Sequence, residues 1–148
     1  MFETFDMSLE ETVEHLSNQL KDKVGGVLGQ RFESSSEDSS EYISSFATTE
    51  WMSNPGGTLH GGIISAMFDH SLGVHAIQAA KKLPTPTTHL NITFCRPVTI
   101  GTRVYVRSRL LTVSRSSIQI LGEAWAEGCP EKIVAYATAS YHIYPDKK

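Results

Sequence analysis

The 148-residue sequence predicts a single α+β domain in which an antiparallel sheet wraps around one long helix. The most apolar segment, residues 59–80, is rich in alanine and too long for a strand, which favours a helix buried on most sides. The chain beyond it alternates strand-like segments with short turns. The length is sufficient for one domain with a real core and too short for two ordinary ones.

The first element is expected to be a helix that begins after Ser8. The run Ser8-Leu9-Glu10-Glu11 has the pattern of a capping box, and Leu9, Val13, Leu16 and Leu20 recur at helical spacing. We expect Gly25-Gly26 to end this helix. Strands are expected over 27–32 and 41–49, with a polar surface turn between them from Ser34 to Ser40.

The long helix is expected over residues 59–80, between the irregular segment Ser53-Asn54-Pro55-Gly56-Gly57 and the cationic pair Lys81-Lys82. A helix that is apolar nearly all round needs cover beyond one sheet face, so we expect a dimer or a larger assembly. The strands that follow are expected at 86–97, 102–114, 117–127 and 132–144, the second of them with a clear period of two.

Composition and charge exclude several classes of protein. No uncharged apolar run approaches the roughly 18 residues that a membrane span needs. The first basic residue is Lys21, which opposes a secretory signal or a transit peptide. Cys95 and Cys129 match no zinc spacing, so we expect free thiols in a cytoplasmic protein.

The net charge of −3 conceals an asymmetry between the two parts of the chain. Residues 1–50 carry 11 acidic and 3 basic residues, a net charge of −8, whereas residues 51–148 carry a net charge of +5. A basic region of this kind attracts a phosphorylated ligand. Its positive charges are too widely spaced along the sequence to indicate nucleic-acid binding, and no nucleic-acid-binding motif accompanies them. We therefore expect no nucleic-acid partner.

Asp69 is the sharpest candidate for chemistry, because it interrupts the most apolar segment of the chain. Burying a carboxylate is costly, so such a residue needs a partner or a purpose. The pattern leaves two interpretations open. Asp69 is either a structural residue bonded to a neighbouring group, such as His70, or a general base or nucleophile.

His60-Gly61-Gly62 stands at the predicted start of the same helix. The first turn of a helix has unpaired N–H groups and a partial positive charge, and glycine allows a ligand to approach closely. The site could therefore polarise a carbonyl, although a tight turn alone also explains the glycines. Eight residues separate Gly61 from Asp69, about 12 Å along a helix. A site that uses both would therefore be shared between two antiparallel copies of the helix.

The other candidate groups are weaker. The histidines show no HExxH or other zinc spacing, so we expect no metal, and His75 and His142 are interpreted as packing or surface residues. No G-x-S-x-G context surrounds any serine, which opposes a serine triad. Cys95 is expected to be buried in a strand, although a reactive thiol there stays possible as an alternative.

The segment from Asn54 to Asp69 resembles the signature of hotdog-fold acyl-CoA thioesterases of the PaaI-like branch. The shared pattern is N-x-x-G-x-x-H-G-G followed seven residues later by Asp. The run from Thr87 to Pro97 resembles that family's strand after the helix, and Gly101 falls where the next turn usually has glycine. The resemblance covers about residues 46–144 and implies one hotdog domain, 1–148, with an N-terminal helical extension over about 8–25.

The resemblance implies a role for each matched residue. Asp69 would be the catalytic nucleophile or general base, and the Gly61 N–H would polarise the thioester carbonyl. His60 would hold the loop and contact substrate, and Asn54 would face Asp69 across a dimer interface. Thr87 would assist the attacking water, and its neighbour Thr88 is an alternative candidate for the same role. The family's other branch uses a Glu on this helix, and none occurs here.

The substrate implied by the resemblance is an acyl-CoA, with no metal or organic cofactor because coenzyme A is part of the substrate. Gly62, Thr88, Arg96 and Arg115 are the candidates for substrate contacts, the two arginines for the coenzyme A phosphates. A homodimer with shared sites, assembled as a dimer of dimers, is also implied. The acyl group stays open between small aromatic and medium-chain groups.

Two other functions remain as alternatives at this stage. The first is a non-catalytic acyl-CoA or acyl-carrier binding module with the same fold. The second is a hydratase or dehydratase, whose pattern typically pairs an Asp with a His five residues on. Here His75 is six residues from Asp69, so the spacing misses by one.

Overall fold

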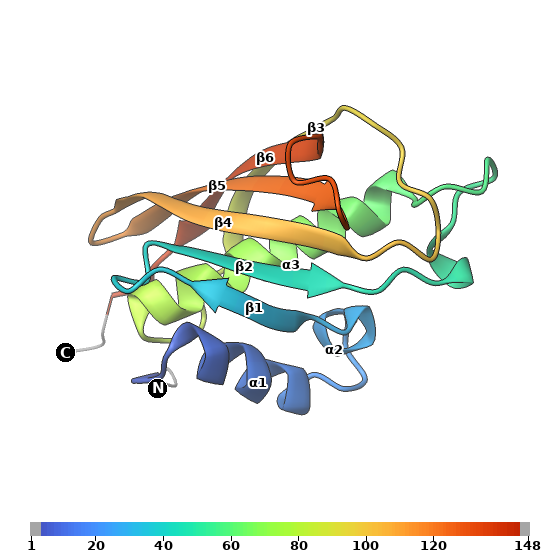
Figure 1. Cartoon of the computed structure of the whole chain (residues 1–148). Helices are drawn as coiled ribbons and strands as arrows, with labels where there is room; N and C mark the ends of the chain where they lie inside the picture. Colours follow the sequence, from blue (N-terminus) through green and yellow to red (C-terminus); the bar gives the residue numbers. More distant parts are fainter. Residues whose placement is uncertain (1–3, 146–148) are drawn as a thin grey trace.

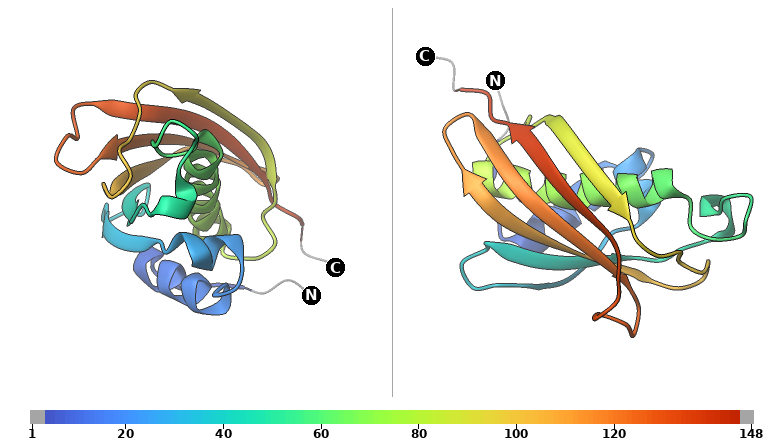
Figure 2. Two further views of the ribbon diagram at one scale, coloured as in Figure 1. Left: turned by 90° about the vertical axis from the view of Figure 1, so that its right-hand side faces the viewer. Right: turned by 90° about the horizontal axis from the view of Figure 1, so that it is seen from above.

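The computed structural model describes residues 4–145 as a six-stranded antiparallel sheet that curves around one long helix (Figure 1). The strand order is β1-β2-β4-β5-β6-β3. The left view of Figure 2 shows α3 inside the curve of the sheet, with α1 and α2 beside it on the open side. The predicted α+β class is confirmed. The elements are α1 (Leu9–Gln19), α2 (Val24–Leu28), β1 (Arg31–Ser35), β2 (Glu41–Phe46), a 3₁₀ turn η1 (Glu50–Met52), α3 (Gly61–Ala80), β3 (Thr87–Phe94), β4 (Val104–Val113), β5 (Ser117–Ala126) and β6 (Ile133–His142).

Helix α3 forms the centre of the core, as the apolar pattern predicted. It begins at Gly61 rather than at Leu59, because His60 has extended backbone angles and caps the helix. Met67, Phe68 and Leu72 are fully buried against the sheet. The residues that pack around them from β4, β5 and β6 include Val104, Val106, Ile118, Ile120, Ala124, Val134, Ala135, Ala137 and Ala139.

The N-terminal segment differs from the prediction in its glycine pair. The capped start is confirmed, since the Ser8 hydroxyl oxygen accepts a hydrogen bond from the Glu11 N–H at 3.1 Å. The helix ends at Gln19, however, and Gly25-Gly26 lie inside α2. A Cβ on Gly26 would lie 1.9 Å from the Leu20 carbonyl oxygen. The prediction that the pair ends α1 is therefore wrong: the glycines let α2 pack directly on the end of α1.

The strands are shorter than predicted at several ends. The strand expected over 27–32 begins only at Arg31, because α2 and a left-handed Gly29 occupy the residues before it. The second predicted strand ends at Phe46. Strand β3 ends at Phe94, so Cys95 lies beyond it and is exposed, contrary to the expectation of a buried thiol. β3 stands at an edge of the sheet and pairs only with β6.

A buried polar network joins α3 to the side of the sheet that carries β2 and β4. His75 is fully buried, with Nδ1 2.7 Å from the Ser108 hydroxyl and Nε2 2.8 Å from the Ser39 carbonyl oxygen. The Tyr42 hydroxyl donates to the Ser71 carbonyl oxygen, and the Tyr42 ring stands edge-on to the His75 ring. Burial lowers the pKa of His75 to about 4, against a weaker opposing effect of the Ser39 carbonyl. The fold therefore holds this histidine neutral.

We expect His75 to make the protein less stable in mild acid. The unfolded chain binds a proton at His75 near pH 6.5, whereas the folded chain does so only near pH 4. The contribution is therefore present above pH 6.5 and lost as the pH falls towards 4. Between pH 7 and pH 5 the free energy of unfolding should fall by about 2 kcal/mol through this residue alone.

Chemical denaturation at pH 7 and pH 5, for the wild type and for His75→Gln, measures this contribution. Glutamine can still bond to Ser108 and Ser39 but does not titrate, so the fall in stability should be smaller in the variant by that amount. Equal falls in the two proteins would show that His75 does not carry the effect.

Candidate active site

The start of α3 presents one unpaired backbone N–H. The His60 Nδ1 accepts the Gly62 N–H at 2.8 Å, and the His60 carbonyl oxygen accepts the N–H groups of Ile63 and Ile64. The Gly61 N–H has no acceptor among residues 4–145. Because the positive end of the helix dipole lies here, this N–H is suited to a developing negative charge. The Gly62 N–H, in contrast, is already bonded to the capping His60 side chain.

The loop before α3 is held by Asn54. Its Oδ1 accepts the Thr58 N–H at 3.0 Å, and its Nδ2 donates to the Thr58 hydroxyl at 2.8 Å. The Phe94 ring packs beside Gly61, where a Cβ would meet it at 3.3 Å. Together they border a pocket of about 360 Å³ lined by Asn54, Thr58, Leu59, Gly61, Ile64, Phe94, Cys95, Arg96 and Pro97. The structure thus gathers three predicted site residues around this pocket, Asn54, Gly61 and Arg96, beside the cap formed by His60 and Gly62.

Asp69 is half-buried and faces the first residue of β3. Its Oδ1 accepts a hydrogen bond from the Thr87 hydroxyl at 2.7 Å. The Tyr141 hydroxyl lies 3.0 Å from the Asp69 carbonyl oxygen and 3.2 Å from the same Oδ1. Burial, reinforced by the nearby carboxylate, raises the pKa of Tyr141, so its proton stays on the oxygen. A hydroxyl from each of two neighbouring strands therefore orients this carboxylate.

Tyr141 was not among the residues that the sequence indicated. It occupies an inward position of β6, where a tyrosine is typical of a core, and nothing in the local pattern links it to Asp69.

The geometry distinguishes Thr87 from Thr88, because Thr88 bonds instead to the Ser140 carbonyl oxygen at 3.1 Å. Only Thr87 contacts the carboxylate among the described threonines.

The predicted residues fall into two groups at opposite ends of the sheet. Gly61, Asn54 and Arg96 lie where β3 ends, and Arg96 donates to the Ile133 carbonyl oxygen at 2.7 Å. Arg115 lies in the β4–β5 hairpin, at the end where β3 begins and where Thr87 contacts Asp69. One chain therefore does not bring Arg96 and Arg115 to the same ligand, and it separates Gly61 from Asp69 by about 12 Å along α3.

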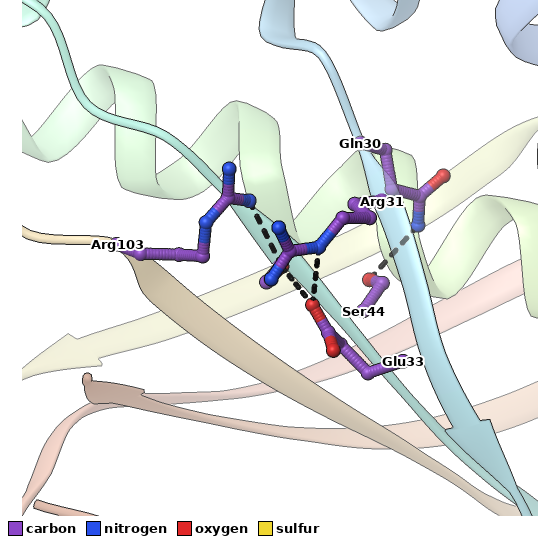
Figure 3. Close-up of polar contacts among 6 residues, drawn as sticks. Gln30, Arg31, Glu33, Ser44 and Arg103 are labelled. Atoms are coloured by element: carbon purple, nitrogen blue, oxygen red, sulfur yellow. Dashed lines mark hydrogen bonds and ion pairs between the residues drawn. The ribbon is translucent and has the colours of Figure 1, made fainter. Parts of the chain in front are cut away.

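A second polar cluster lies on β1, β2 and the residue before β4, and it has a structural character (Figure 3). Glu33 accepts hydrogen bonds from Ser45 at 2.6 Å and from Arg31 at 2.7 Å, and Arg103 donates to Ser45 at 3.0 Å. Partial burial opposes these contacts, but their sum lowers the pKa of Glu33. A carboxylate stabilised in its charged form by two arginines is a poor general base. We therefore place no chemistry there.

The aromatic and sulfur-containing residues divide between core and surface. Met67 and Phe68 are fully buried, so they fill the core. Phe94 and Trp51 have 52% and 58% of their surface exposed.

Within residues 4–145 no three His, Cys, Asp or Glu residues are grouped as a metal site would require. None of the described helices is long and apolar enough to cross a membrane.

The fold and the site define a class: hotdog proteins with an acidic residue in the central helix and a glycine at its start. Residues 56–133 match the sequence profile of the thioesterase superfamily, and the chain belongs to that family. It is accordingly a hydrolase of thioesters. The resemblance stated from the sequence is confirmed at this level.

Solved structures support the assignment. A phenylacetic acid degradation-related protein from Ralstonia eutropha JMP134 is 27% identical, with a TM-score of 0.72, over 86% of this chain and 98% of that one. The PaaI protein of the phenylacetic acid degradation operon of E. coli is 18% identical, with a TM-score of 0.73, over 93% and 100%. The smu.793 protein of Streptococcus mutans UA159, solved with acetyl CoA bound, is 18% identical, with a TM-score of 0.69, over 81% and 92%.

The last two likenesses concern the fold alone. A search of curated protein sequences finds no match. Family membership favours an enzyme over the non-catalytic binding module that the sequence left open. The hydratase alternative is opposed by the structure, because His75 is buried in its own polar network and cannot reach a substrate beside Asp69.

The structural part of the His60 role can be tested by replacing the cap. His60→Ala removes the acceptor of the Gly62 N–H and should lower the free energy of unfolding by about 1 kcal/mol. His60→Asn supplies another good capping side chain and should retain the stability. Thermal unfolding of the three proteins measures the difference. Equal losses in both variants would mean that the imidazole contributes more than its cap.

Proposed function

We propose that this thioesterase hydrolyses the thioester of acyl-CoA to a free acid and coenzyme A at the carboxylate of Asp69. The observation that carries the proposal is the Thr87–Asp69 hydrogen bond at the single carboxylate of α3, combined with the unpaired Gly61 N–H. Asp69 acts either as the nucleophile on the carbonyl carbon or as the general base on a water molecule. The proposal needs no metal and no cofactor besides the substrate's own coenzyme A.

Each polar neighbour has a part in this scheme. The Gly61 N–H donates to the carbonyl oxygen as negative charge develops on it. His60 accepts the Gly62 N–H and so fixes the helix start at which the Gly61 N–H is left unpaired. Thr87 and Tyr141 restrict the rotation of the Asp69 carboxylate, which keeps one oxygen, Oδ2, without a hydrogen-bond donor among the described residues. That oxygen is the reacting atom in this proposal.

The two groups of site residues meet only if two chains assemble. In a two-fold dimer with antiparallel α3 helices, the Gly61 end of one protomer faces the Asp69 of its partner. Asn54 then lies across from Asp69, and Arg96 of one protomer joins the end that carries Arg115 of the other. The exposed edge strand β3, unpaired on one side, is available for such a contact. Two such dimers would form the tetramer that the resemblance implies.

The coenzyme A is proposed to bind at the Gly61 end. Arg96 lines the pocket there, and residues 51–148 carry a net charge of +5, which suits a ligand with several phosphate charges. The acetyl CoA bound to the similarly folded S. mutans protein supports this class of ligand. Thr88 and Gly62 contribute less than expected, because both already use a polar group within the chain.

Replacing Asp69 tests the proposed reaction directly. Asp69→Asn keeps the shape of the side chain but removes its basic and nucleophilic oxygen, so kcat should fall by about 10² to 10⁴. Release of free thiol from a panel of acyl-CoAs measures the rate, and circular dichroism and gel filtration check that the variant folds and assembles as the wild type does. Full activity in a well-folded Asp69→Asn would exclude Asp69 as the catalytic group.

The Gly61 N–H can be removed without altering the helix start. Gly61 is the first residue of α3, where proline is well tolerated, and His60 already has the extended backbone that precedes proline. Gly61→Pro should lower kcat by about 10² to 10³. Gly61→Ala is the matched control, because it adds a Cβ beside Phe94 but keeps the N–H.

The same variants test the sharing of the site. A mixed dimer of Gly61→Pro and Asp69→Asn contains one site with both native groups, so co-expressed and purified mixed dimers should recover about half of the wild-type activity. A lack of rescue in verified mixed dimers would place the complete site within one chain. That result would contradict the shared arrangement.

A further inference from the structure

A second pocket opens on the other side of Asp69, away from the helix start. It has a volume of about 360 Å³ and a mostly apolar lining that comes from α1, α2, α3 and the loop before β3. Asp69 is the one carboxylate among its lining residues. These are Leu16, Gln19, Leu20, Val24, Gly25, Ala66, Asp69, His70, Gly73, Val74, Ile77 and Leu83.

The outer wall of this pocket is the N-terminal segment. Leu16 of α1 is buried against Val74 of α3, and Leu20 packs at the margin of the same cluster. Helix α2 then crosses close to α3, because a Cβ on Gly25 would lie 2.5 Å from the His70 ring. The glycine pair thus allows two short helices to close over α3 with space left between them.

The residues around the pocket suit an uncharged, apolar ligand. Besides Asp69, the titratable group in the wall is His70, and burial lowers the pKa of His70, which keeps the ring neutral near pH 7. Side chains of Leu, Val, Ile and Ala supply most of the remaining surface. A pocket of this size is near the lower limit of those that enclose small molecules, which fits a short or medium chain or a single ring.

We propose that this pocket holds the acyl group of the substrate, and that α1 and α2 set the largest acyl group that the enzyme accepts. The inference rests on the proposed function, because the pocket meets the reacting carboxylate at Asp69. The thioester carbonyl then lies between Asp69 and the Gly61 N–H of the partner, with the acyl chain extending towards Leu20. The outer limit on acyl size therefore comes from residues 9–28, outside the segment 56–133 that matches the family, while α3 forms the inner wall.

Filling the pocket from α1 tests this assignment. Leu20→Trp places a larger side chain in the acyl space, and kcat/KM should be measured for acetyl-, butyryl-, hexanoyl-, octanoyl- and dodecanoyl-CoA. The ratio of the octanoyl to the butyryl value should fall at least tenfold, because the fit of one methylene group in an apolar pocket changes kcat/KM by about 10- to 200-fold. The fall should appear mainly in KM, because Leu20 lies away from the reacting atoms.

Asn18→Trp is the matched control. Asn18 lies two residues earlier, in the last turn of α1, but borders a different groove between α1 and β1, so the octanoyl to butyryl ratio should stay within twofold of the wild type. Leu20→Ala provides the opposite change, and it should raise the dodecanoyl to octanoyl ratio. Thermal unfolding and gel filtration verify all three variants.

The outcomes separate this inference from the proposed function. Unchanged ratios in well-folded Leu20→Trp and Leu20→Ala would overturn the acyl pocket, while the loss of activity in Asp69→Asn would still support the reaction. Equal shifts of the octanoyl to butyryl ratio in Leu20→Trp and Asn18→Trp would also overturn it. The ratio would then depend on a large side chain anywhere in this segment and not on the pocket. No thiol release from any acyl-CoA by the wild type would instead overturn the proposed function.

Discussion

The arrangement of the molecule depends on one close contact, between Phe68 of α3 and the bare backbone of Gly122 in β5. A Cβ on Gly122 would lie 2.8 Å from the Phe68 ring and 3.1 Å from Leu72, so the helix sits deeper in the curved sheet than any side chain would allow. This contact fixes the depth of α3 and its rotation about its own axis. The direction of every other side chain on the helix follows from it.

The polar residues of α3 are understood from that rotation. Asp69 follows Phe68 directly, so it points about 100° away from the sheet centre, towards the edge formed by β3 and β6. Thr87 and Tyr141 meet it there. Ser71 and His75 point to the opposite side. There the Ser71 hydroxyl lies 3.3 Å from the Ser44 hydroxyl, and His75 Nδ1 lies 2.7 Å from the Ser108 hydroxyl. One helix thus carries a closed structural network on one side and an open carboxylate on the other.

The N-terminal helices complete the surface that the sheet leaves uncovered. The curved sheet covers α3 on one side only, and α1 and α2 cover part of the opposite side (Figure 2). Gly25 brings α2 against the His70 ring of α3, Gly26 packs on the backbone of Leu20 at the end of α1, and a cavity remains beside Asp69. A segment outside the matched residues 56–133 therefore borders Asp69, the proposed catalytic group.

Features that depend on neighbouring residues could be predicted from the sequence: the cap at Ser8, the length and burial of α3, the alternation in β4, and the spacing from His60-Gly61-Gly62 to Asp69. Which groups meet depends on the folded chain, since Thr87 and Tyr141 lie 18 and 72 positions from Asp69 in the sequence. The folded chain also decided that Arg96 and Arg115 lie at opposite ends of the sheet, and that Gly25-Gly26 form a close contact rather than a helix end. Local patterns report backbone preferences and periodicity, whereas contacts of this kind arise from the packing of distant segments, which no short-range pattern contains.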